Sequence, residues 1–251
     1  MEKNFKDHFS DKSDAYSVHR PGYPDELFSF LATLTEGHDR AWDCGTGSGQ
    51  SAVALTRFYA EVIATDASEN QIKNAKPAKG VIYKNQPAEQ TTIESESVDL
   101  ITVAQALHWF DFEEFGREAN RVLKPGGILA AWTYGLHKIS PEIDKVIDDL
   151  YGPMLNQFWP PERQHIDEGY ENIKLPMREI KAPEFRMEIE WDLSQLIGYL
   201  KTWSAVKKYE SQNGANPVDL KYEELQRLWE NPDRKQLIKW PLTLKVWTKS
   251  K

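Results

Sequence analysis

The segment AWDCGTGSGQSAVALTRF, residues 41–58, contains the turn that decides the fold. A short apolar run ends at Asp43, glycines follow at Gly45, Gly47 and Gly49, and a helix-compatible stretch begins. Glycines at these positions allow a tight turn, close approach of a ligand to the backbone, and close packing of a helix against a strand. The pattern therefore predicts a strand, a nucleotide-type loop and a helix.

Outward from this loop, short apolar runs alternate with segments that are compatible with helices. The runs predicted to be strands are residues 40–43, 61–65, 81–84, 98–103 and 128–133. Residues 51–58 and 112–122 are long enough for helices that cross back over a sheet, and LKPGG at 123–127 predicts a stop and a turn. This alternation is typical of parallel strands joined by crossover helices. We therefore expect residues 39–135 to form an α/β cofactor-binding core with a largely parallel sheet.

An N-terminal arm is expected over residues 1–38. Pro21 and Pro24 break the chain there and precede a predicted helix over residues 25–34. The arm is expected to lie across the ligand.

After the core the alternation stops. Residues 136–177 are rich in aromatic residues and proline, which predicts a lid insertion. Within residues 178–251, the apolar positions of 193–203 follow the period of an amphipathic helix. Residues 185–191 and 243–248 predict strands that return to the sheet, so this last region is expected to complete the domain and the substrate pocket.

The composition favours an ordinary soluble globular protein. The chain has 251 residues, of which 40% are hydrophobic and 28% are charged, and this length suits one domain with a sizeable insertion or two small domains. It carries 31 Lys and Arg against 39 Asp and Glu, a net charge of −8. An acidic balance disfavours general attraction to nucleic acid or to anionic lipid. A small-molecule substrate is therefore expected, and the oligomeric state is left open.

The sequence also predicts a cytoplasmic protein. The first residues, MEKNFKDHFSDKSD, are charged and polar where a signal peptide needs an apolar segment. Among the longest apolar runs is GILAAW at 127–132, far short of the roughly 20 residues of a membrane span. Cys44, the single cysteine, can form neither an internal disulfide nor a cysteine zinc cluster, and no other metal-ligand spacing emerges.

Acidic residues at two strand ends distinguish between possible cofactors. Asp66 ends the next predicted strand, where a carboxylate can accept hydrogen bonds from ribose hydroxyls. The NAD fingerprint has its third glycine later than Gly49, and the carboxylate of Asp43 is awkward for a pyrophosphate. The same charge suits the ammonium and sulfonium groups of S-adenosylmethionine. A purely structural turn is the remaining alternative.

Several motifs make the chain resemble class I S-adenosylmethionine-dependent methyltransferases with a methyltransferase type 11 domain, over residues 41–132. In order they are DCGTGSGQ, ATDAS, NQPAEQT, VDLITVAQALHWF and RVLKPGGILAAW. The flanking AYSVHRPGYPDELFSFL and the late TWSA are similar to the trans-aconitate methyltransferase-like branch. The resemblance implies a Rossmann-like sheet of seven mostly parallel strands, one of them antiparallel, with helices on both faces and a helical lid. It also implies S-adenosylmethionine as the cofactor and a carboxylate as the favoured acceptor.

The resemblance assigns the cofactor-binding residues. They lie in the arm, in the glycine loop at the methionine side, at the ribose, beside the adenine and on the floor after the fourth strand: Tyr16 and Arg20; Asp43, Gly45, Thr46, Gly47 and Gly49; Asp66 and Ala67; Ala88 and Glu89; Ala104 and Gln105. Many relatives have an acidic residue where Pro87 stands. A contact to the adenine amino group must therefore come from backbone atoms or from a neighbour such as Glu89.

His108 is the candidate general base, because it follows the fourth strand at the edge where ligands of open α/β sheets bind. The alternative is that His108 and Trp109 only cap and pack this loop. A hydroxyl or ammonium acceptor needs a base, whereas a carboxylate acceptor is already nucleophilic. Aromatic and basic residues are expected to enclose the acceptor, namely Trp109, Trp159, Arg163, Trp203 and Tyr209.

Three alternatives accompany this interpretation. One is an O- or N-methyltransferase that acts on another metabolite, since the fold supports many acceptors. A non-catalytic adenosyl-ligand-binding or scaffolding protein belongs to a different class. An NAD-dependent reductase is the third. The sequence does not identify the methyl acceptor.

Overall fold

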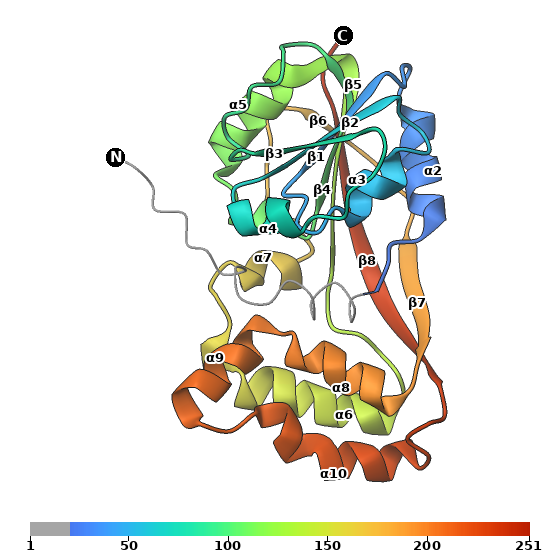
Figure 1. Ribbon diagram of the computed structural model, residues 1–251, viewed down its shortest axis with the longest axis vertical. Helices are drawn as coiled ribbons and strands as arrows, with labels where there is room; N and C mark the ends of the chain where they lie inside the picture. The colour runs from blue at the N-terminus through green and yellow to red at the C-terminus, as the bar shows by residue number, and fades with distance from the viewer. Residues whose placement is uncertain (1–20) are drawn as a thin grey trace.

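The structure of the chain, a computed structural model that describes residues 21–251, is built around one sheet (Figure 1). The strands lie in the order β3-β2-β1-β4-β5-β8-β6, and β7 also pairs with β8. Their bounds are β1 Arg40–Cys44, β2 Glu61–Asp66, β3 Val81–Asn85, β4 Val98–Ala104, β5 Leu123–Tyr134, β6 Arg178–Ile180, β7 Phe185–Trp191 and β8 Gln236–Thr248. All the predicted strands are confirmed, and those from β3 to β5 are parallel.

Within residues 21–251 the sheet has eight strands, whereas the resemblance implies seven. Both β6 and β7 pair antiparallel with β8, β6 with residues 246–248 and β7 with residues 236–242. β6 and β7 therefore lie one after the other along the same edge of β8. The interruption at residues 181–184 contains Pro183, which has no N–H to donate to a ladder. Because β8 is also antiparallel to β5, β8 is the one strand in the described part of the sheet that runs against the others.

Helices cover both faces of the central strands. α2 Asp25–Leu34 and α3 Gln50–Leu55 lie on one face and α5 Phe112–Val122 on the other, while α4 Glu69–Asn74 follows β2 (Figure 1). Strands β1, β2 and β4 are consequently buried over nearly their whole length. The predicted helices over 25–34 and 112–122 are confirmed. The helix predicted over 51–58 ends at Leu55, where turns with hydrogen bonds between residues three apart replace it.

The LKPGG segment differs from the prediction. The helix stops at Val122 as expected, but residues 123–127 form the start of β5 and no separate turn. The irregularity is taken up within the strand, whose register with β4 shifts between Val98 and Leu100. Gly126 has a φ of 77°, in the left-handed region that glycine favours. The predicted turn has therefore become a local irregularity of the ladder.

A helical layer lies beyond the carboxyl end of β5 (Figure 1). It consists of α6 Pro141–Asp149, α8 Leu193–Lys201, α9 Ser204–Asn213 and α10 Pro217–Trp229, with the short turns η2 Leu150–Met154 and η3 Asn156–Phe158. The helix predicted over 193–203 is thus shorter, because Trp203 leaves the helical conformation before α9 begins. The short elements η1 Leu107–Trp109 and α7 Arg163–Asp167 contact each other at the side of the sheet that faces this layer.

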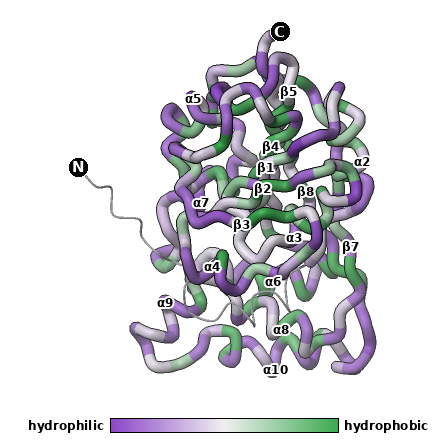
Figure 2. Tube along the Cα trace, turned by 45° about the horizontal axis from the view of Figure 1, so that its top comes forward, coloured by the Kyte–Doolittle hydropathy of each residue, from purple (hydrophilic) through white to green (hydrophobic). Residues whose placement is uncertain are grey.

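Hydrophobic residues line the central strands, while many outer loops are hydrophilic (Figure 2). No helix within residues 21–251 combines the length and the apolar character that crossing a membrane requires.

Candidate functional site

The glycine loop after β1 combines close packing with an open backbone. Gly45, Gly47 and Gly49 have φ values of 69°, 53° and 83°. A Cβ atom on Gly45 would lie 2.6 Å from the Cβ of Ala106, and one on Gly49 would lie 2.3 Å from the hydroxyl oxygen of Tyr83. A Cβ atom on Gly47 would meet nothing within 4 Å. The outer two glycines are therefore required by packing, and Gly47 leaves space beside its backbone.

Asp43, at the end of β1, is a buried carboxylate that is 1% exposed. Its Oδ1 accepts a hydrogen bond from the hydroxyl of Thr102 at 2.7 Å, and its Oδ2 accepts one from Thr46 at 2.5 Å. Burial raises the pKa of Asp43 to about 6, although both hydrogen bonds oppose the shift. No Lys or Arg of the described residues forms an ion pair with it. A buried carboxylate of this kind fits a cationic ligand group such as the ammonium of S-adenosylmethionine.

Asp66, at the end of β2, connects the first two loops. Its Oδ2 accepts from the backbone N–H of Gly47 at 2.9 Å, and its Oδ1 accepts from that of Ser68 at 2.8 Å. Asn85 donates its amide to the carbonyl of Ala67 at 3.0 Å and thereby ties the third loop to the second. A carboxylate has about four lone-pair sites, so these contacts are compatible with the predicted ribose role.

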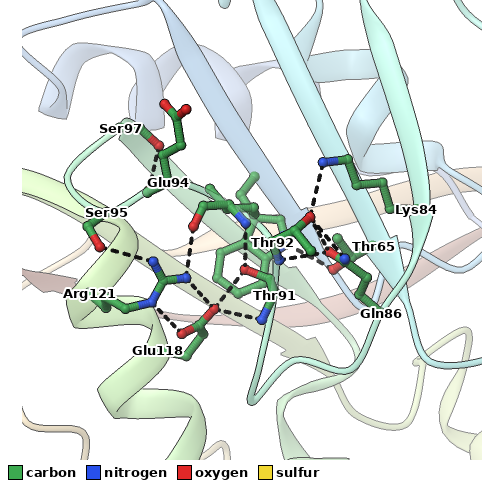
Figure 3. A network of polar contacts seen from close by, with 12 residues as sticks. Thr65, Lys84, Gln86, Thr91, Thr92, Glu94, Ser95, Ser97, Glu118 and Arg121 are labelled. Atoms are coloured by element: carbon green, nitrogen blue, oxygen red, sulfur yellow. Dashed lines mark hydrogen bonds and ion pairs between the residues drawn. The ribbon is translucent and has the colours of Figure 1, made fainter.

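The loop after β3, residues 86–97, is fixed against α5 by a polar network (Figure 3). Oε1 of Glu118 accepts from the N–H of Thr91 at 2.8 Å and from its hydroxyl at 2.7 Å. Arg121 donates to the other carboxylate oxygen at 2.8 Å and to the carbonyl of Ile93 at 2.8 Å. Because Glu118 is 8% exposed, water competes little for these bonds.

This loop presents the residues predicted to lie beside the adenine. Ala88 is 6% exposed and Pro87 is exposed. Oε1 of Glu89 accepts from the backbone N–H of Asp111 at 3.0 Å, at the start of α5. Since this oxygen binds the protein, an adenine contact by Glu89 would use its other oxygen or its backbone.

Gln105 holds a strained turn at the end of β4, next to Ala104. Its φ of 56° is unusual for a residue other than glycine. The side chain accepts from the hydroxyl of Thr133 at 2.7 Å and donates to the carbonyl of Tyr134 at 3.3 Å. These contacts to β5 hold the strained backbone in place, which is typical of a functional edge.

His108 lies in η1 and is 6% exposed. Its Nδ1 is 3.0 Å from the hydroxyl oxygen of Tyr170, and its ring centroid is 4.7 Å from that of Trp109. Burial lowers the pKa of His108 to about 3, and the nearby charges of Arg163 and His165 contribute. The contacts with Tyr170 and Trp109 are compatible with the packing alternative, and the general-base role stays a prediction.

Arg163 lies over an aromatic pair, Tyr151 and Trp159, whose ring centroids are 4.9 Å apart. Its guanidinium carbon lies 4.8 Å from the ring centroid of Trp159 and 5.2 Å from that of Tyr151. Nε donates to the Tyr151 hydroxyl at 2.8 Å, and that hydroxyl donates to Asp167 at 2.7 Å. Within the described part of the chain, neither Nη1 nor Nη2 has a hydrogen-bond partner. A fixed guanidinium with two such nitrogens fits a carboxylate.

Of the other predicted acceptor residues, Trp203 contacts the aromatic pair. Trp203 is 6% exposed, and its ring lies 5.6 Å from that of Trp159. Tyr209 packs on Phe158 at 5.1 Å, within the helical layer. Trp109 is half-buried beside His108. The predicted residues Tyr16 and Arg20 lie outside the described residues.

The prediction missed four residues that shape the site, namely Thr102, Tyr151, Tyr170 and His137. For Thr102 a signal existed, because the strand order expected for this fold pairs β1 with β4 and brings Thr102 opposite Asp43. No comparable signal exists for Tyr151, Tyr170 and His137, which lie in irregular segments or connections.

Known proteins are similar to this chain in sequence and in structure. A family model described as a methyltransferase domain matches residues 42–131. A methyltransferase of Dictyostelium discoideum is 38% identical over 204 residues, which cover 80% of this chain and 78% of that protein. A solved structure of a type II methyltransferase from Anaeromyxobacter dehalogenans is 39% identical, with a TM-score of 0.87, and the match covers 92% of this chain and 99% of that one. An S-adenosylmethionine-dependent methyltransferase of Saccharomyces cerevisiae is 28% identical over 151 residues, 57% of this chain and 48% of that protein.

The fold, the loop geometry and these relatives together define a class. The chain belongs to the class I S-adenosylmethionine-dependent methyltransferases. It is an enzyme of that class, and its cofactor is S-adenosylmethionine. The non-catalytic and NAD-dependent alternatives are thereby set aside.

Proposed function

We propose that this methyltransferase acts on a small-molecule acid and that a carboxylate oxygen accepts the methyl group. The observation that carries the proposal is the guanidinium of Arg163, which lies over the neighbouring rings of Tyr151 and Trp159 near the loop after β4. Guanidinium groups bind carboxylates through two parallel hydrogen bonds. The resemblance to the trans-aconitate methyltransferase-like branch points to the same class of acceptor.

The residues on the cofactor side bind and orient. Asp43 would hold the ammonium group, Asp66 the ribose, and the backbone beside Gly47 the chain between them. The cofactor supplies a methyl group that is already activated by its sulfonium. The protein therefore has mainly to align the acceptor and to exclude water.

The acceptor side needs no proton removal if the acceptor is a carboxylate. A carboxylate has about four lone-pair sites. When two of them accept hydrogen bonds from Arg163, two remain for attack on the methyl group. The neutral state of His108 at physiological pH is compatible with this chemistry, because no base has to act. The rings of Trp159 and Trp203 would cover the apolar body of the acid.

We further propose that the arm of residues 1–38 covers the bound ligands and that residues 136–177 act as the lid.

A matched set of acceptors tests the chemistry. Each reaction contains the enzyme, S-adenosylmethionine with an isotopically labelled methyl group, and one acceptor. The acceptors are phenylacetate, 2-phenylethanol and 2-phenylethylamine, and then hexanoate, hexanol and hexylamine. Methyl esters release methanol in mild alkali, whereas methyl ethers and methylamines do not. We expect an alkali-labile product from an acid. An alkali-stable product from an alcohol or amine would overturn the carboxylate acceptor and support O- or N-methylation.

A further inference from the structure

His137 is a buried histidine that no motif of the sequence explains. It follows the carboxyl end of β5 after Gly135 and Leu136, and it is 1% exposed. Neither Nδ1 nor Nε2 has a hydrogen-bond partner in the described part of the chain. Buried nitrogens without partners are uncommon in native proteins, and each calls for an explanation.

Three aromatic residues surround His137 and form a histidine cluster with it. The ring centroids of Tyr199 and Trp240 lie 5.5 Å from that of His137, and that of Trp203 lies 6.3 Å away. Nε1 of Trp240 donates to the hydroxyl oxygen of Tyr199 at 3.3 Å. These two residues thus pair with each other and leave the imidazole as the unsatisfied group.

The imidazole of His137 is neutral. Burial lowers the pKa of His137 to about 3, and Lys138 adds to the effect. A neutral imidazole offers one donor and one acceptor. A phenylalanine would fill similar space without leaving polar atoms unsatisfied, so packing alone does not account for a histidine at this position.

The histidine cluster adjoins the predicted acceptor residues. Trp203 belongs to the cluster, and its ring also lies 5.6 Å from that of Trp159, which contacts the guanidinium of Arg163. A Cβ atom on Gly135 would meet nothing within 4 Å, so open space adjoins the segment that carries His137. A ligand whose carboxylate is held at Arg163 could therefore extend along these rings toward His137.

We infer that His137 is a specificity-determining residue of the acceptor site, where it hydrogen-bonds to a hydroxyl or carbonyl oxygen on the apolar body of the acid. This inference rests on the proposed function. It narrows the acceptor to an acid with an apolar or aromatic body and a second, uncharged polar group away from the carboxylate.

Binding of matched probes tests the inference. The full chain is saturated with S-adenosylhomocysteine, and quenching of its tryptophan fluorescence reports the binding of phenylacetate against 4-hydroxyphenylacetate and of hexanoate against 6-hydroxyhexanoate. In the wild type we expect the hydroxyl to tighten binding roughly three- to tenfold in at least one pair, the yield of one hydrogen bond. His137→Phe should bind the parent acid as before and lose this preference, while its melting temperature stays level or rises.

His38→Phe is the matched control. Nε2 of His38 lies 3.0 Å from the carbonyl of Ala32, and its ring lies 5.3 Å from that of Tyr59. This variant should melt at a lower temperature and keep the preference for the hydroxyl. If His137→Phe keeps the preference for the hydroxyl, or if the wild type shows no such preference, the inference about His137 is overturned while the proposed function stands. If S-adenosylhomocysteine binds and no acid does, the proposed acid acceptor fails, and the inference fails with it.

Discussion

The proposed cofactor half and the proposed acceptor half of this site are constructed differently. In the cofactor half, backbone N–H groups and short polar side chains at neighbouring strand ends hold one another, as Asp66 holds Gly47. In the acceptor half, rings from distant segments meet, as Trp159 meets Trp203 and His108 meets Tyr170. We therefore expect a change in the first half to disturb the backbone that is proposed to bind the cofactor. We expect a change in the second half to alter the proposed acceptor site while leaving the sheet intact.

The glycine loop should show the largest effects. Gly45→Ala places a Cβ atom 2.6 Å from that of Ala106 at a positive φ, and we expect the free energy of unfolding to fall by about 3 kcal/mol. Gly47→Ala meets open space and should cost only about 1 kcal/mol, but its methyl group would occupy the ligand side of the backbone. Urea denaturation and calorimetric titration with S-adenosylhomocysteine separate the two results. Equal destabilisation by both substitutions would contradict the division of roles within the loop.

Asp43→Asn should weaken S-adenosylhomocysteine binding about 10- to 100-fold, because it removes a charge-assisted contact worth roughly 1.5 to 3 kcal/mol. The pKa of Asp43 is raised to about 6 in the fold, so the carboxylate charges as the pH rises through that value. Wild-type affinity should therefore increase between about pH 5 and pH 7, while the variant shows no such increase.

The same shift has a consequence for stability, with the opposite sign. A carboxyl whose pKa is raised on folding stabilises the fold below its unfolded pKa of 3.8, and this contribution is lost as the pH rises through about 6. Ligand-free Asp43→Asn should accordingly be at least as stable as the wild type at pH 7. Calorimetry across the pH range measures both effects, and a less stable variant at pH 7 would show that the charged form is favoured.

Arg163→Gln tests the acceptor half. We expect the KM of the acid acceptor to rise about tenfold or more, because a guanidinium–carboxylate pair is lost, while the Kd of S-adenosylhomocysteine stays unchanged. Arg163→Lys keeps the charge but loses the planar fork and the stacking on Trp159, so its KM should be intermediate. Steady-state kinetics with both variants decide the matter. A parallel loss of cofactor affinity would show that the two halves are not separable here.

His108→Gln should have the smallest effect on catalysis. With a carboxylate acceptor, single-turnover rates should fall about tenfold or less, because only orientation is disturbed. Tyr170→Phe removes the same 3.0 Å contact and should behave alike. A loss beyond a thousandfold in His108→Gln that Tyr170→Phe does not share would identify His108 as a general base.

The sequence predicted the sheet and the glycine loop well because both depend on local patterns. Apolar runs separated by helical stretches mark parallel strands, and glycine spacing marks a turn. The division of β6 from β7 was missed because it depends on how residues 181–184 meet β8. Likewise, the packing of His108 on Tyr170 joins residues 62 positions apart. No periodicity or short motif encodes such a contact, which follows from the tertiary arrangement of η1 and α7.

β8 has a consequence for the order in which the protein folds. It lies between β5 and the β6/β7 edge, yet it is the last strand to be synthesised. Until it emerges from the ribosome, β6 and β7 have no neighbour, and Trp240 is not there to pack against the helical layer. The edge of β5 therefore stays unpaired until β8 is available, and closure of the sheet is a late, non-local event.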